Sequence, residues 1–399
     1  MSHYPLLRLK KNEDQRIKAG HLWIFSNEVD IAATPLKAFA AGAMAVVENA
    51  RGDALGLAYV NPASLISARI LTRNPGIVID SAFLIERLRR ALALRERLFP
   101  QPCYRLVYGE SDGLPGVVID RFGPVFSVQT TTAGAEKLLD PLLAALDELF
   151  RPTAVVLRNT AALRDLEGLE SYTRVAVGTL PDSVILHENG CQFRIDPAAG
   201  QKTGWFYDHR DNRARLAHWA AGKRVLDLFA YSGAWGIQAA VAGATRVNLV
   251  DSSEPALSLA QDNAARNNVA NRVSTVAEDV FDFLRQAREE RQRYDIVIAD
   301  PPAFIKRRKD VTQGVEAYRR LNQAAIQVLN PGGLLVSASC SFHLEPATLH
   351  DLLRGTARHL DRHLVLIARG GQAADHPIHP AIPETDYLKA LFAHVDRSL

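Results

Sequence analysis

The sequence has 399 residues and a formal net charge of +3 at pH 7, with 47% hydrophobic and 23% charged residues. These values indicate a globular protein of two or three domains that can bury a core. They argue against a membrane span, because no stretch of about 18 uncharged apolar residues occurs, and against a uniformly basic surface for nucleic acid.

The start of the sequence has no apolar segment followed by a small-residue cleavage site, so we expect no secretion signal. Three cysteines occur, Cys103, Cys191 and Cys340, and none forms a Cys-x-x-Cys pair. We therefore expect neither a disulfide framework nor a zinc site, and the composition fits a reducing cytoplasm.

Residues 3–73 have the pattern of short strands and turns. The strands Ala43–Glu48 and Leu55–Val60 flank a polar turn at residues 49–53, which indicates a hairpin, and Ser67–Thr72 is another strand. Nine Lys and Arg residues against six Asp and Glu give this segment a mild positive excess. We predict a small β-rich domain over residues 1–74.

Residues 75–190 predict a helix followed by an α+β domain. Asp80 is a candidate N-cap for an amphipathic helix from Phe83 to Phe99. The later elements are expected strands at 104–108, 116–120, 125–130, 154–158 and 184–187, and a helix at 135–150.

From about residue 191 to the C-terminus, apolar strands alternate with helical segments such as Trp235–Ala242 and Pro255–Asn267. The expected strands are 225–228, 247–251, 273–276, 296–300 and 334–337. Apolar strands that alternate with helices imply a parallel, doubly wound sheet of Rossmann-like type. The predicted fold class is α/β for this domain, residues 191–399.

Ligands in such sheets bind beyond the carboxyl ends of the strands, so the residues there are the first candidates for a site. The first strand ends in Asp227, followed by a turn of small residues that reaches Gly233. The second strand ends in Asp251, where a carboxylate can accept hydrogen bonds from ribose hydroxyls. Asp279 and Val280 follow the third strand and suit an adenine. Together they predict a nucleoside-containing cofactor.

An NAD enzyme is the first alternative for this pattern. The full Gly-x-Gly-x-x-Gly fingerprint is missing, since only Gly233 lies in the turn and Gly236 in the helix after it. A pyrophosphate ligand needs the closer backbone approach that those glycines allow, so the NAD reading is disfavoured.

The fourth strand ends in Asp300-Pro301-Pro302-Ala303-Phe304. Two prolines keep this loop out of helical geometry. They would present Asp300 rigidly toward the ligand crevice, where Phe304 can flank a flat base.

These strand-end sequences resemble the motifs of class I methyltransferases. The run from Gln201 to Arg213, the Ser339-Cys340-Ser341 tripeptide and the late segment 372–377 narrow the resemblance to the RlmI family of ribosomal large-subunit RNA methyltransferases. The resemblance extends over nearly the whole chain. It implies an N-terminal PUA domain, a small central α+β domain, a Rossmann-like catalytic domain, and S-adenosyl-L-methionine (SAM) as the cofactor.

Strand-end position and resemblance together give one set of expected cofactor-binding residues. They are Lys202, Thr203, Arg210, Asn212, Asp227, Phe229, Ala230, Tyr231, Ser232, Gly233, Asp251, Ser252, Asp279, Val280, Asp300 and Pro301.

Cys340 lies just past the fifth strand and is the candidate nucleophile. Cytosine C5 is a poor nucleophile until a thiolate adds at C6, and a thiol with a pKa of about 8.5 needs a positive or polar neighbour. His343 and the basic run 306–309 are both candidates for that neighbour. Family analogy assigns Asp300 to the N3/N4 edge of the cytosine. We assign no residue to the final removal of the C5 proton. The centre of the Asp-Pro-Pro loop is occupied by Ala303, whose side chain cannot accept a proton.

Basic and aromatic residues predict two RNA contacts. Phe304, Lys306, Arg307 and Arg308, with Lys309, follow the Asp-Pro-Pro loop and could hold phosphates beside the target base. The PUA resemblance adds Lys10 and Lys11, although the nearby Trp23 and Phe25 can equally be core residues. His376 and His379 lack an evident third ligand, so we predict no metal.

The predicted function is therefore 5-methylcytosine formation in 23S ribosomal RNA. The sequence leaves the oligomeric state open, with a homodimer as one option. A methyltransferase acting on a base nitrogen, such as that of guanine, remains an alternative because it needs no cysteine. A non-catalytic RNA-binding protein with the same fold is the alternative of another class. Intact acids at 251, 279 and 300 argue against it.

Overall fold

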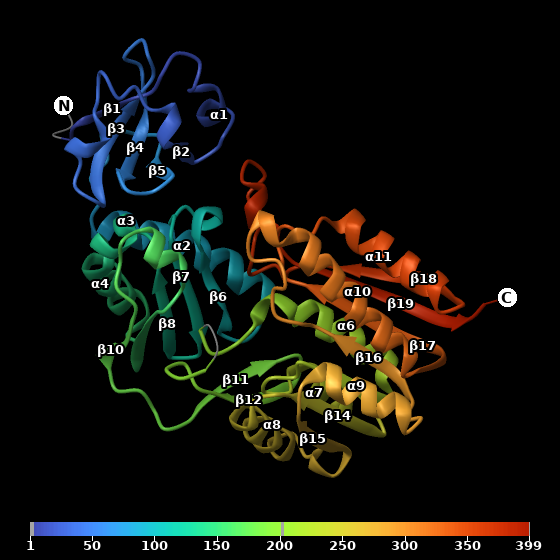
Figure 1. The fold of residues 1–399 in the computed structure, drawn as a ribbon. Helices are drawn as coiled ribbons and strands as arrows, with labels where there is room; N and C mark the ends of the chain where they lie inside the picture. Colours follow the sequence, from blue (N-terminus) through green and yellow to red (C-terminus); the bar gives the residue numbers. More distant parts are fainter. Residues whose placement is uncertain (1–3, 201–202, 399) are drawn as a thin grey trace. The chain divides into compact units, whose positions relative to one another are not determined.

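The computed structural model describes residues 4–200 and 203–398. Their contacts divide the chain into two compact units, which we describe separately. The first unit comprises residues 1–184, 195–207 and 374–385, and the second comprises 185–194, 208–373 and 386–399. Figure 1 gives the element labels used below.

The first unit begins with a five-stranded sheet in the order β1-β3-β4-β5-β2. The hairpin predicted around residues 49–53 is confirmed, since β3 and β4 pair antiparallel on either side of it. The core of this sheet is aliphatic and includes Leu7, Val47 and Ile70. The elements are β1 (Leu6–Arg8), α1 (Gln15–Lys18), β2 (Trp23–Phe25), β3 (Ala43–Glu48), β4 (Ala54–Val60) and β5 (Ile66–Thr72).

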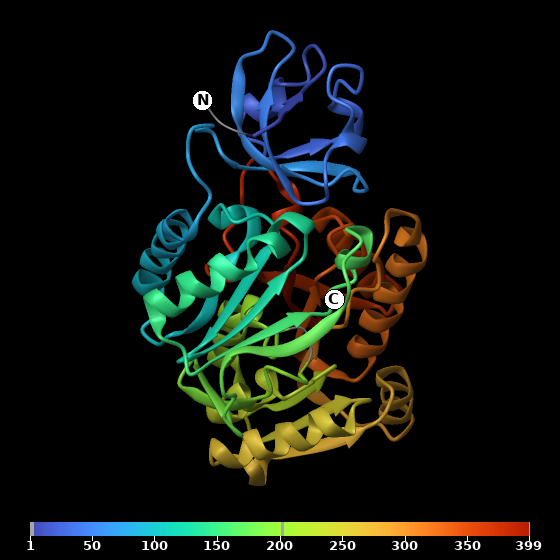
Figure 2. The ribbon, with the colours of Figure 1, turned by 90° about the vertical axis from the view of Figure 1, so that its left-hand side faces the viewer.

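A second five-stranded sheet in this unit has the order β10-β9-β8-β7-β6, with α2 and α4 packed together beside it (Figure 2). Asp80 caps α2 as predicted, because its carboxylate accepts a hydrogen bond from the Phe83 N–H at 3.0 Å. The elements are α2 (Ser81–Leu98), β6 (Cys103–Tyr108), β7 (Val117–Phe122), β8 (Val125–Thr130), α3 (Ala133–Lys137), α4 (Leu139–Phe150), β9 (Ala154–Asn159), α5 (Leu163–Leu166) and β10 (Tyr172–Gly178). The sequence pattern did not predict β10.

Buried polar contacts join the two sheets of the first unit. The Tyr59 hydroxyl donates to the Pro115 carbonyl at 3.1 Å and accepts from Thr132 at 2.9 Å. Glu167 accepts from the amide of Asn61 at 2.7 Å and pairs with Arg69 at 3.2 Å. The N-terminal sheet is thus fastened to the sheet that follows it.

The second unit is built on a seven-stranded sheet in the order β15-β14-β13-β16-β17-β19-β18. Its strands are β13 (Arg224–Leu228), β14 (Arg246–Asp251), β15 (Val273–Ala277), β16 (Tyr294–Ala299), β17 (Leu329–Ser339), β18 (Arg362–Gly370) and β19 (Lys389–Arg397). The strands from β15 to β17 are parallel as predicted. The strands β18 and β19 were not predicted from the sequence, and β19 inserts antiparallel between β17 and β18.

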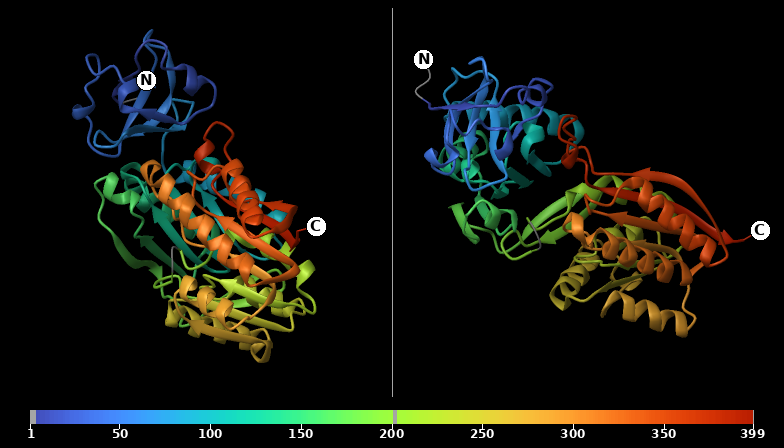
Figure 3. Two further views of the ribbon diagram at one scale, coloured as in Figure 1. Left: turned by 45° about the vertical axis from the view of Figure 1, so that its right-hand side comes forward. Right: turned by 45° about the horizontal axis from the view of Figure 1, so that its top comes forward.

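Helices cover both faces of this sheet. The helices α6 (Arg210–Ala220), α7 (Ala234–Val241) and α8 (Glu254–Arg266) form one layer. The other layer contains α9 (Val280–Glu289), α10 (Val311–Gln327) and α11 (Pro346–His359), drawn from gold to red in Figure 3. A two-stranded ribbon, β11 (Val184–Glu188) with β12 (Cys191–Ile195), precedes them.

The parallel strands β13 to β17 end at one edge of the sheet, which is where a doubly wound fold binds its ligands. Asp227, Asp251, Asp300 and Cys340 all lie at or just beyond these strand ends. In the described part of the chain, none of the helices is both long and apolar enough to cross a membrane.

Candidate active site

The turn after β13 has an unusual backbone. Phe229, Tyr231 and Gly233 have φ angles of +59°, +48° and +82°, so every second residue is left-handed. These are positions where glycine would be preferred, and each larger residue there costs about 1–2 kcal/mol. The turn therefore keeps a glycine-type conformation although two of the three residues carry aromatic rings. Predicting the conformation from glycines alone would miss it.

Two polar atoms in this region are buried and have no hydrogen-bond partner among the described residues. They are Asp227 Oδ1 and Ser232 Oγ. The other Asp227 oxygen accepts from the Gly236 N–H at 2.9 Å. Burial raises the pKa of Asp227 to about 8, and the nearby Asp300 and Asp251 carboxylates act in the same direction. An ammonium group such as that of SAM would satisfy Asp227 Oδ1, so these residues fit the predicted cofactor.

Asp251 and Asp279 both cap local structure. Asp251 accepts from the Tyr231 N–H and from the Ser253 N–H, each at 2.9 Å, which ties the turn after β13 to the end of β14. Asp279 accepts from the Phe281 N–H at 2.8 Å as the N-cap of α9. Carboxylate oxygens have further lone pairs, so both can still accept from a nucleoside. Ser252 is exposed, and Val280 is buried in the core of this unit.

Asp300 is held from two sides. His209 Nε2 lies 3.2 Å from its Oδ1, and the Trp235 indole N–H donates to Oδ2 at 3.1 Å. Burial by itself raises the pKa of Asp300, but His209 and the Trp235 bond more than offset this and keep the pKa below its usual value. Asp300 is thus an ionised acceptor with a fixed orientation. The run from Gln201 to Arg213 that carries the family resemblance includes His209, but the sequence alone assigned no role to His209 or to Trp235.

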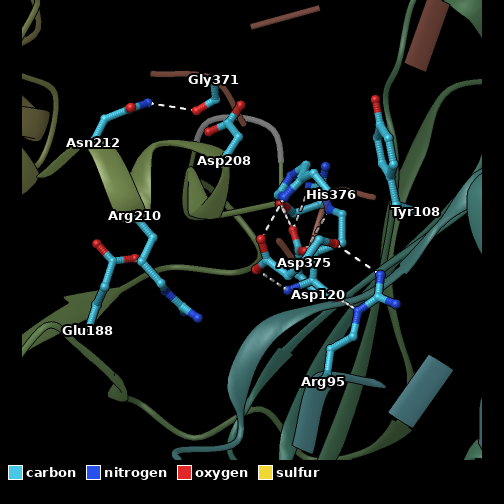
Figure 4. A network of polar contacts seen from close by, with 12 residues as sticks. Arg95, Tyr108, Asp120, Glu188, Asp208, Arg210, Asn212, Gly371, Asp375 and His376 are labelled. Atoms are coloured by element: carbon cyan, nitrogen blue, oxygen red, sulfur yellow. Dashed lines mark hydrogen bonds and ion pairs between the residues drawn. The ribbon is translucent and has the colours of Figure 1, made fainter. Parts of the chain in front are cut away.

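Asn212 is placed behind His209. Its amide nitrogen donates to the Gly371 carbonyl at 2.8 Å, shown in Figure 4, and lies 3.1 Å from His209 Nδ1. The expected cofactor residue Asn212 is therefore 98% buried and bonded to the protein's own groups.

The expected cofactor residues upstream of Asn212 have several placements. Arg210 is buried and pairs with Glu188 at 3.5 Å, while Arg213 pairs with the same carboxylate at 2.7 Å. Thr203 belongs to the first unit, where its hydroxyl donates to Asp120. Lys202 lies outside the described residues.

The loop after Asp300 packs on aromatic rings. Pro301 is buried, and the Phe304 ring meets Phe229 edge-on at 6.5 Å and Tyr318 at 4.8 Å between centroids. Ala230, in the turn after β13, is buried as well. Phe304 is partly exposed and keeps surface available to a flat base.

Cys340 sits on a rigid frame at the end of β17. Ser339 and Ser341, on either side of it, are buried, and both hydroxyls bond to the Tyr318 hydroxyl, at 2.8 and 2.9 Å. The Ile305 N–H donates to Ser341 Oγ at 3.2 Å, which ties the Asp-Pro-Pro loop to the cysteine turn. Cys340 itself is partly exposed. The structure therefore brings the thiol and the Asp300 loop together.

A lysine that sequence reasoning missed lies beside Cys340. Lys389, at the start of β19, pairs in register with Ser339, and its ammonium donates to the Ser341 carbonyl at 2.7 Å. Burial lowers the pKa of Lys389, and the Cys340 thiolate is one of the groups that oppose this. The two candidate activators from sequence are placed differently: His343 packs on Phe342, and Lys306 is exposed.

The other two cysteines are buried. Burial raises the pKa of Cys191 to about 11, with a further contribution from Glu188, so this thiol is protonated at neutral pH.

The basic residues expected to contact RNA are exposed. Lys306, Arg307, Arg308 and Lys309 follow the Asp-Pro-Pro loop, and Arg307 pairs with Asp310 at 3.0 Å. Lys10 and Lys11 are exposed in the N-terminal sheet domain, with the Lys10 ammonium on the Asn27 carbonyl at 2.8 Å. The Trp23 indole N–H donates to Glu110 at 2.8 Å, so this ring has a structural partner within the first unit.

The late histidine segment forms local structure. His376 Nδ1 lies 2.8 Å from Asp375, whose other oxygen accepts from the Arg105 N–H at 3.0 Å, and Arg95 donates to the Asp375 carbonyl at 3.0 Å (Figure 4). Within residues 4–200 and 203–398, no cluster of three His, Cys, Asp or Glu side chains could hold a metal ion.

The mixed seven-stranded sheet, its strand-end acids and the left-handed turn define a SAM-dependent methyltransferase. The model of the S-adenosylmethionine-dependent methyltransferase family matches residues 172–393, and that of the PUA-like domain matches residues 7–73. The fold class predicted from the sequence is thereby confirmed apart from the β19 insertion, and so is SAM as the cofactor.

Within this class, the chain belongs to the family of ribosomal RNA large subunit methyltransferase I. It is 36% identical to the protein of that name from Klebsiella pneumoniae over 399 residues, with 99% of each chain covered. It is 38% identical to the one from Shewanella frigidimarina over 394 residues, covering 98% of this chain and 99% of that one.

Solved structures agree in fold. A chain described as a SAM-dependent methyltransferase from Streptococcus mutans superposes with a TM-score of 0.82 at 20% identity, covering 98% of this chain and all of that one. Another methyltransferase structure, complexed with SAH, gives a TM-score of 0.84 at 20% identity over the same shares.

Proposed function

We propose that this protein transfers a methyl group from SAM to C5 of a cytosine in 23S ribosomal RNA, with Cys340 as a covalent nucleophile. The single observation that carries the proposal is the position of Cys340, partly exposed on a rigid turn that is bonded to the Asp300 loop. The names of the full-length relatives support ribosomal RNA as the substrate.

The residues that would hold SAM lie at the strand ends. The unpartnered Asp227 Oδ1 suits the cofactor's ammonium, Asp251 its ribose, and Asp279 with Val280 its adenine. When bound, SAM supplies an electrophilic methyl group. Phe229 and Tyr231 add aromatic surface in the turn that follows β13.

The chemistry requires a thiolate. The Cys340 sulfur would form a bond to C6 of the cytosine, and the electron pair released to C5 would form the bond to the methyl group. The methyl–sulfur bond of SAM would break in the same step and leave S-adenosylhomocysteine. A base then removes the C5 proton, the C5–C6 double bond re-forms, and the thiolate leaves. The ammonium of Lys389 stabilises the thiolate form of Cys340. The hydrogen bonds of the Tyr318 hydroxyl to Ser339 and Ser341 fix the turn that carries Cys340.

Asp300 would contact the amino edge of the cytosine. Its carboxylate is ionised and accepts hydrogen bonds, so it complements the N4 amino group. A cytosine in structured RNA must leave its stack to reach this position, at a cost of a few kcal/mol.

RNA binding is proposed to involve two basic regions. Lys306, Arg307 and Arg308 are exposed after the Asp-Pro-Pro loop and would lie next to the target base, and Lys10 and Lys11 are exposed in the PUA-like domain. Phosphate contacts of this kind make binding fall steeply with salt. We propose domain limits of 1–74, 75–190 and 191–399, and the cytoplasm as the compartment, since ribosomal RNA is the proposed substrate.

Replacement of Cys340 tests the covalent mechanism. Cys340→Ala should lower methyl transfer to 23S RNA transcript by at least about a thousandfold, because the uncatalysed C5 carbon is a weak nucleophile. Cys191→Ala, which removes a buried thiol from the same unit, is the control and should retain activity. Full turnover by Cys340→Ala would instead favour methylation of a base nitrogen.

A further inference from the structure

The polar residues behind Asp300 form a continuous hydrogen-bonded chain. It runs from the Gly371 carbonyl through Asn212 and His209 to the Asp300 carboxylate. We propose that His209 is a positioning residue, fixed by Asn212 in its neutral Nε2–H form, which orients Asp300 as an acceptor for the amino group of the target cytosine. This inference rests on the proposed function and adds the residues that set base specificity.

The orientation of Asn212 determines the protonation of His209. The Gly371 carbonyl can only accept, so the amide nitrogen of Asn212, rather than its oxygen, must face it at 2.8 Å. The same nitrogen lies 3.1 Å from His209 Nδ1 and has a second N–H to donate. His209 Nδ1 is therefore the acceptor, and the ring proton resides on Nε2. That proton points at Asp300 Oδ1, 3.2 Å away.

Packing keeps Asn212 in this orientation. Its side chain lies so close to Gly370 that a Cβ added there would come within 1.8 Å of Asn212 Oδ1. Asn212 is 2% exposed and His209 4% exposed. Both side chains are therefore closely surrounded by protein, which favours the orientation that the hydrogen bonds require.

The charges around Asp300 make this donor necessary. Asp208 and Asp227 both repel a negative charge on Asp300, and the hydrogen bond from His209 opposes this repulsion. With Trp235 on Oδ2 and His209 on Oδ1, both oxygens receive a hydrogen bond in the ionised form. Burial raises the pKa of Asp300, and the hydrogen bonds from His209 and Trp235 act against burial and lower it.

An ionised, oriented carboxylate distinguishes cytosine from uracil. Cytosine presents an amino donor at C4, whereas uracil presents a carbonyl acceptor that a carboxylate repels. A protonated Asp300 could donate to the uracil carbonyl and lose this discrimination. His209 therefore acts on specificity through Asp300 without touching the base.

The ring proton can be observed directly in the wild-type protein. Long-range proton–nitrogen NMR of histidine-labelled full-length protein, with His209→Gln to assign the signal, reports which ring nitrogen carries the proton. We expect a neutral ring with the proton on Nε2 at pH 7.5. A proton on Nδ1, or a doubly protonated ring, would overturn the inference without reference to activity.

Kinetics test the consequence with two matched variants. His209→Leu removes the donor, so kcat/KM on 23S RNA transcript should fall at least tenfold more at pH 6 than at pH 8 relative to wild type. Methylation of transcript carrying uracil at the target should rise. His209→Gln, whose amide N–H can still reach Asp300, should recover the wild-type pH profile, and His218→Asn on the exposed side of α6 is the control.

The outcomes separate the two proposals. If wild type methylates cytosine C5 but the His209→Leu profile overlays it, this inference alone is overturned. If wild type methylates a purine nitrogen, the proposed function is overturned and base selection by Asp300 with it. SAM binding measured by calorimetry identifies a variant that has failed to fold.

Discussion

Asp227 is the residue whose charge depends most on its surroundings. It is fully buried, and burial raises its pKa to about 8. Its folded pKa lies above its unfolded one, so it favours the folded state below pH 4 and this contribution is lost progressively up to about pH 8. At high pH the ionised, buried carboxylate of Asp227 destabilises the folded state, and a cation close to Oδ1 would offset this effect.

We therefore predict a pH-dependent affinity for SAM. Between pH 6 and about 7.5 the affinity of the wild-type protein should increase, because binding of the ammonium favours the ionised carboxylate; above that range the ammonium itself loses its proton. Asp227→Asn should bind SAM more weakly and lose this pH dependence, while unfolding at a higher urea concentration than wild type at pH 8.5. Calorimetry and urea titration measure both, and an unchanged pH slope in the variant would contradict the assignment.

Lys389 gives a prediction about the reactivity of a single thiol. Removing the ammonium in Lys389→Met should raise the pKa of Cys340, and a rise of one unit lowers its alkylation rate near pH 7 about tenfold. Iodoacetamide labelling followed by peptide mass spectrometry measures this rate. Lys223→Met, at an exposed position of the same unit, serves as the control. Equal labelling rates in both variants would exclude Lys389 as the activating group.

At the scale of elements, the sequence predicted the strands whose ends form the site. The parallel strands β13 to β17 are continuous apolar runs, and parallel order directs Asp227, Asp251 and Asp300 to one edge. Periodicity could not show that β19 inserts antiparallel beside β17. The sequence therefore could not predict that Lys389 lies near Cys340, because the position of Lys389 opposite Ser339 results from the insertion of β19.

Other parts of the site depend on contacts between distant elements. His209 reaches Asp300 from 91 positions upstream, and no local pattern marks such a pair. The missing glycines in the turn after β13 correctly disfavoured NAD, but they concealed that Phe229 and Tyr231 adopt the left-handed conformation. Strand alternation also failed for β10, an edge strand whose side chains are largely exposed.

The hydroxyl of Tyr318 joins α10 to the end of β17, so removal of this hydroxyl tests the contribution of that contact. Tyr318→Phe leaves the buried hydroxyls of Ser339 and Ser341 without their shared partner. We expect a loss of about 2 kcal/mol in unfolding free energy and a slower methyl transfer. Tyr294→Phe, which loses a single bond to Gln292, should cost less than about 1 kcal/mol. Similar urea midpoints for the two variants would show that the Tyr318 hydroxyl does not stabilise the Cys340 turn.

At the scale of the whole molecule, buried polar contacts unite the PUA-like sheet with the sheet that follows it. Glu167, which is 5% exposed, bonds to Asn61, directly after β4, and to Arg69 in β5. It also accepts from the Ala133 N–H at the start of α3, a helix that contacts β8 of the second sheet. A PUA-like domain held in this way presents Lys10 and Lys11 from a fixed base within its unit.

Loss of Glu167 should loosen this arrangement. Glu167→Ala leaves Arg69 buried with only a longer contact to Glu110, at a cost of about 3 kcal/mol. We expect a separate, earlier unfolding step of the N-terminal sheet in calorimetry. Glu170→Ala, at an exposed position nearby, is the control. A single transition at the wild-type temperature would show that Glu167 does not hold the two sheets together.

The central claim is that Cys340 becomes covalently bound to a cytosine of ribosomal RNA during methyl transfer. The most direct measurement traps that bond, because fluorine at C5 cannot leave as a proton does. Wild-type protein incubated with SAM and 23S transcript containing 5-fluorocytosine should form a stable adduct, and peptide mass spectrometry should locate it on Cys340. Methylation of ordinary transcript without any adduct on Cys340 would contradict the account.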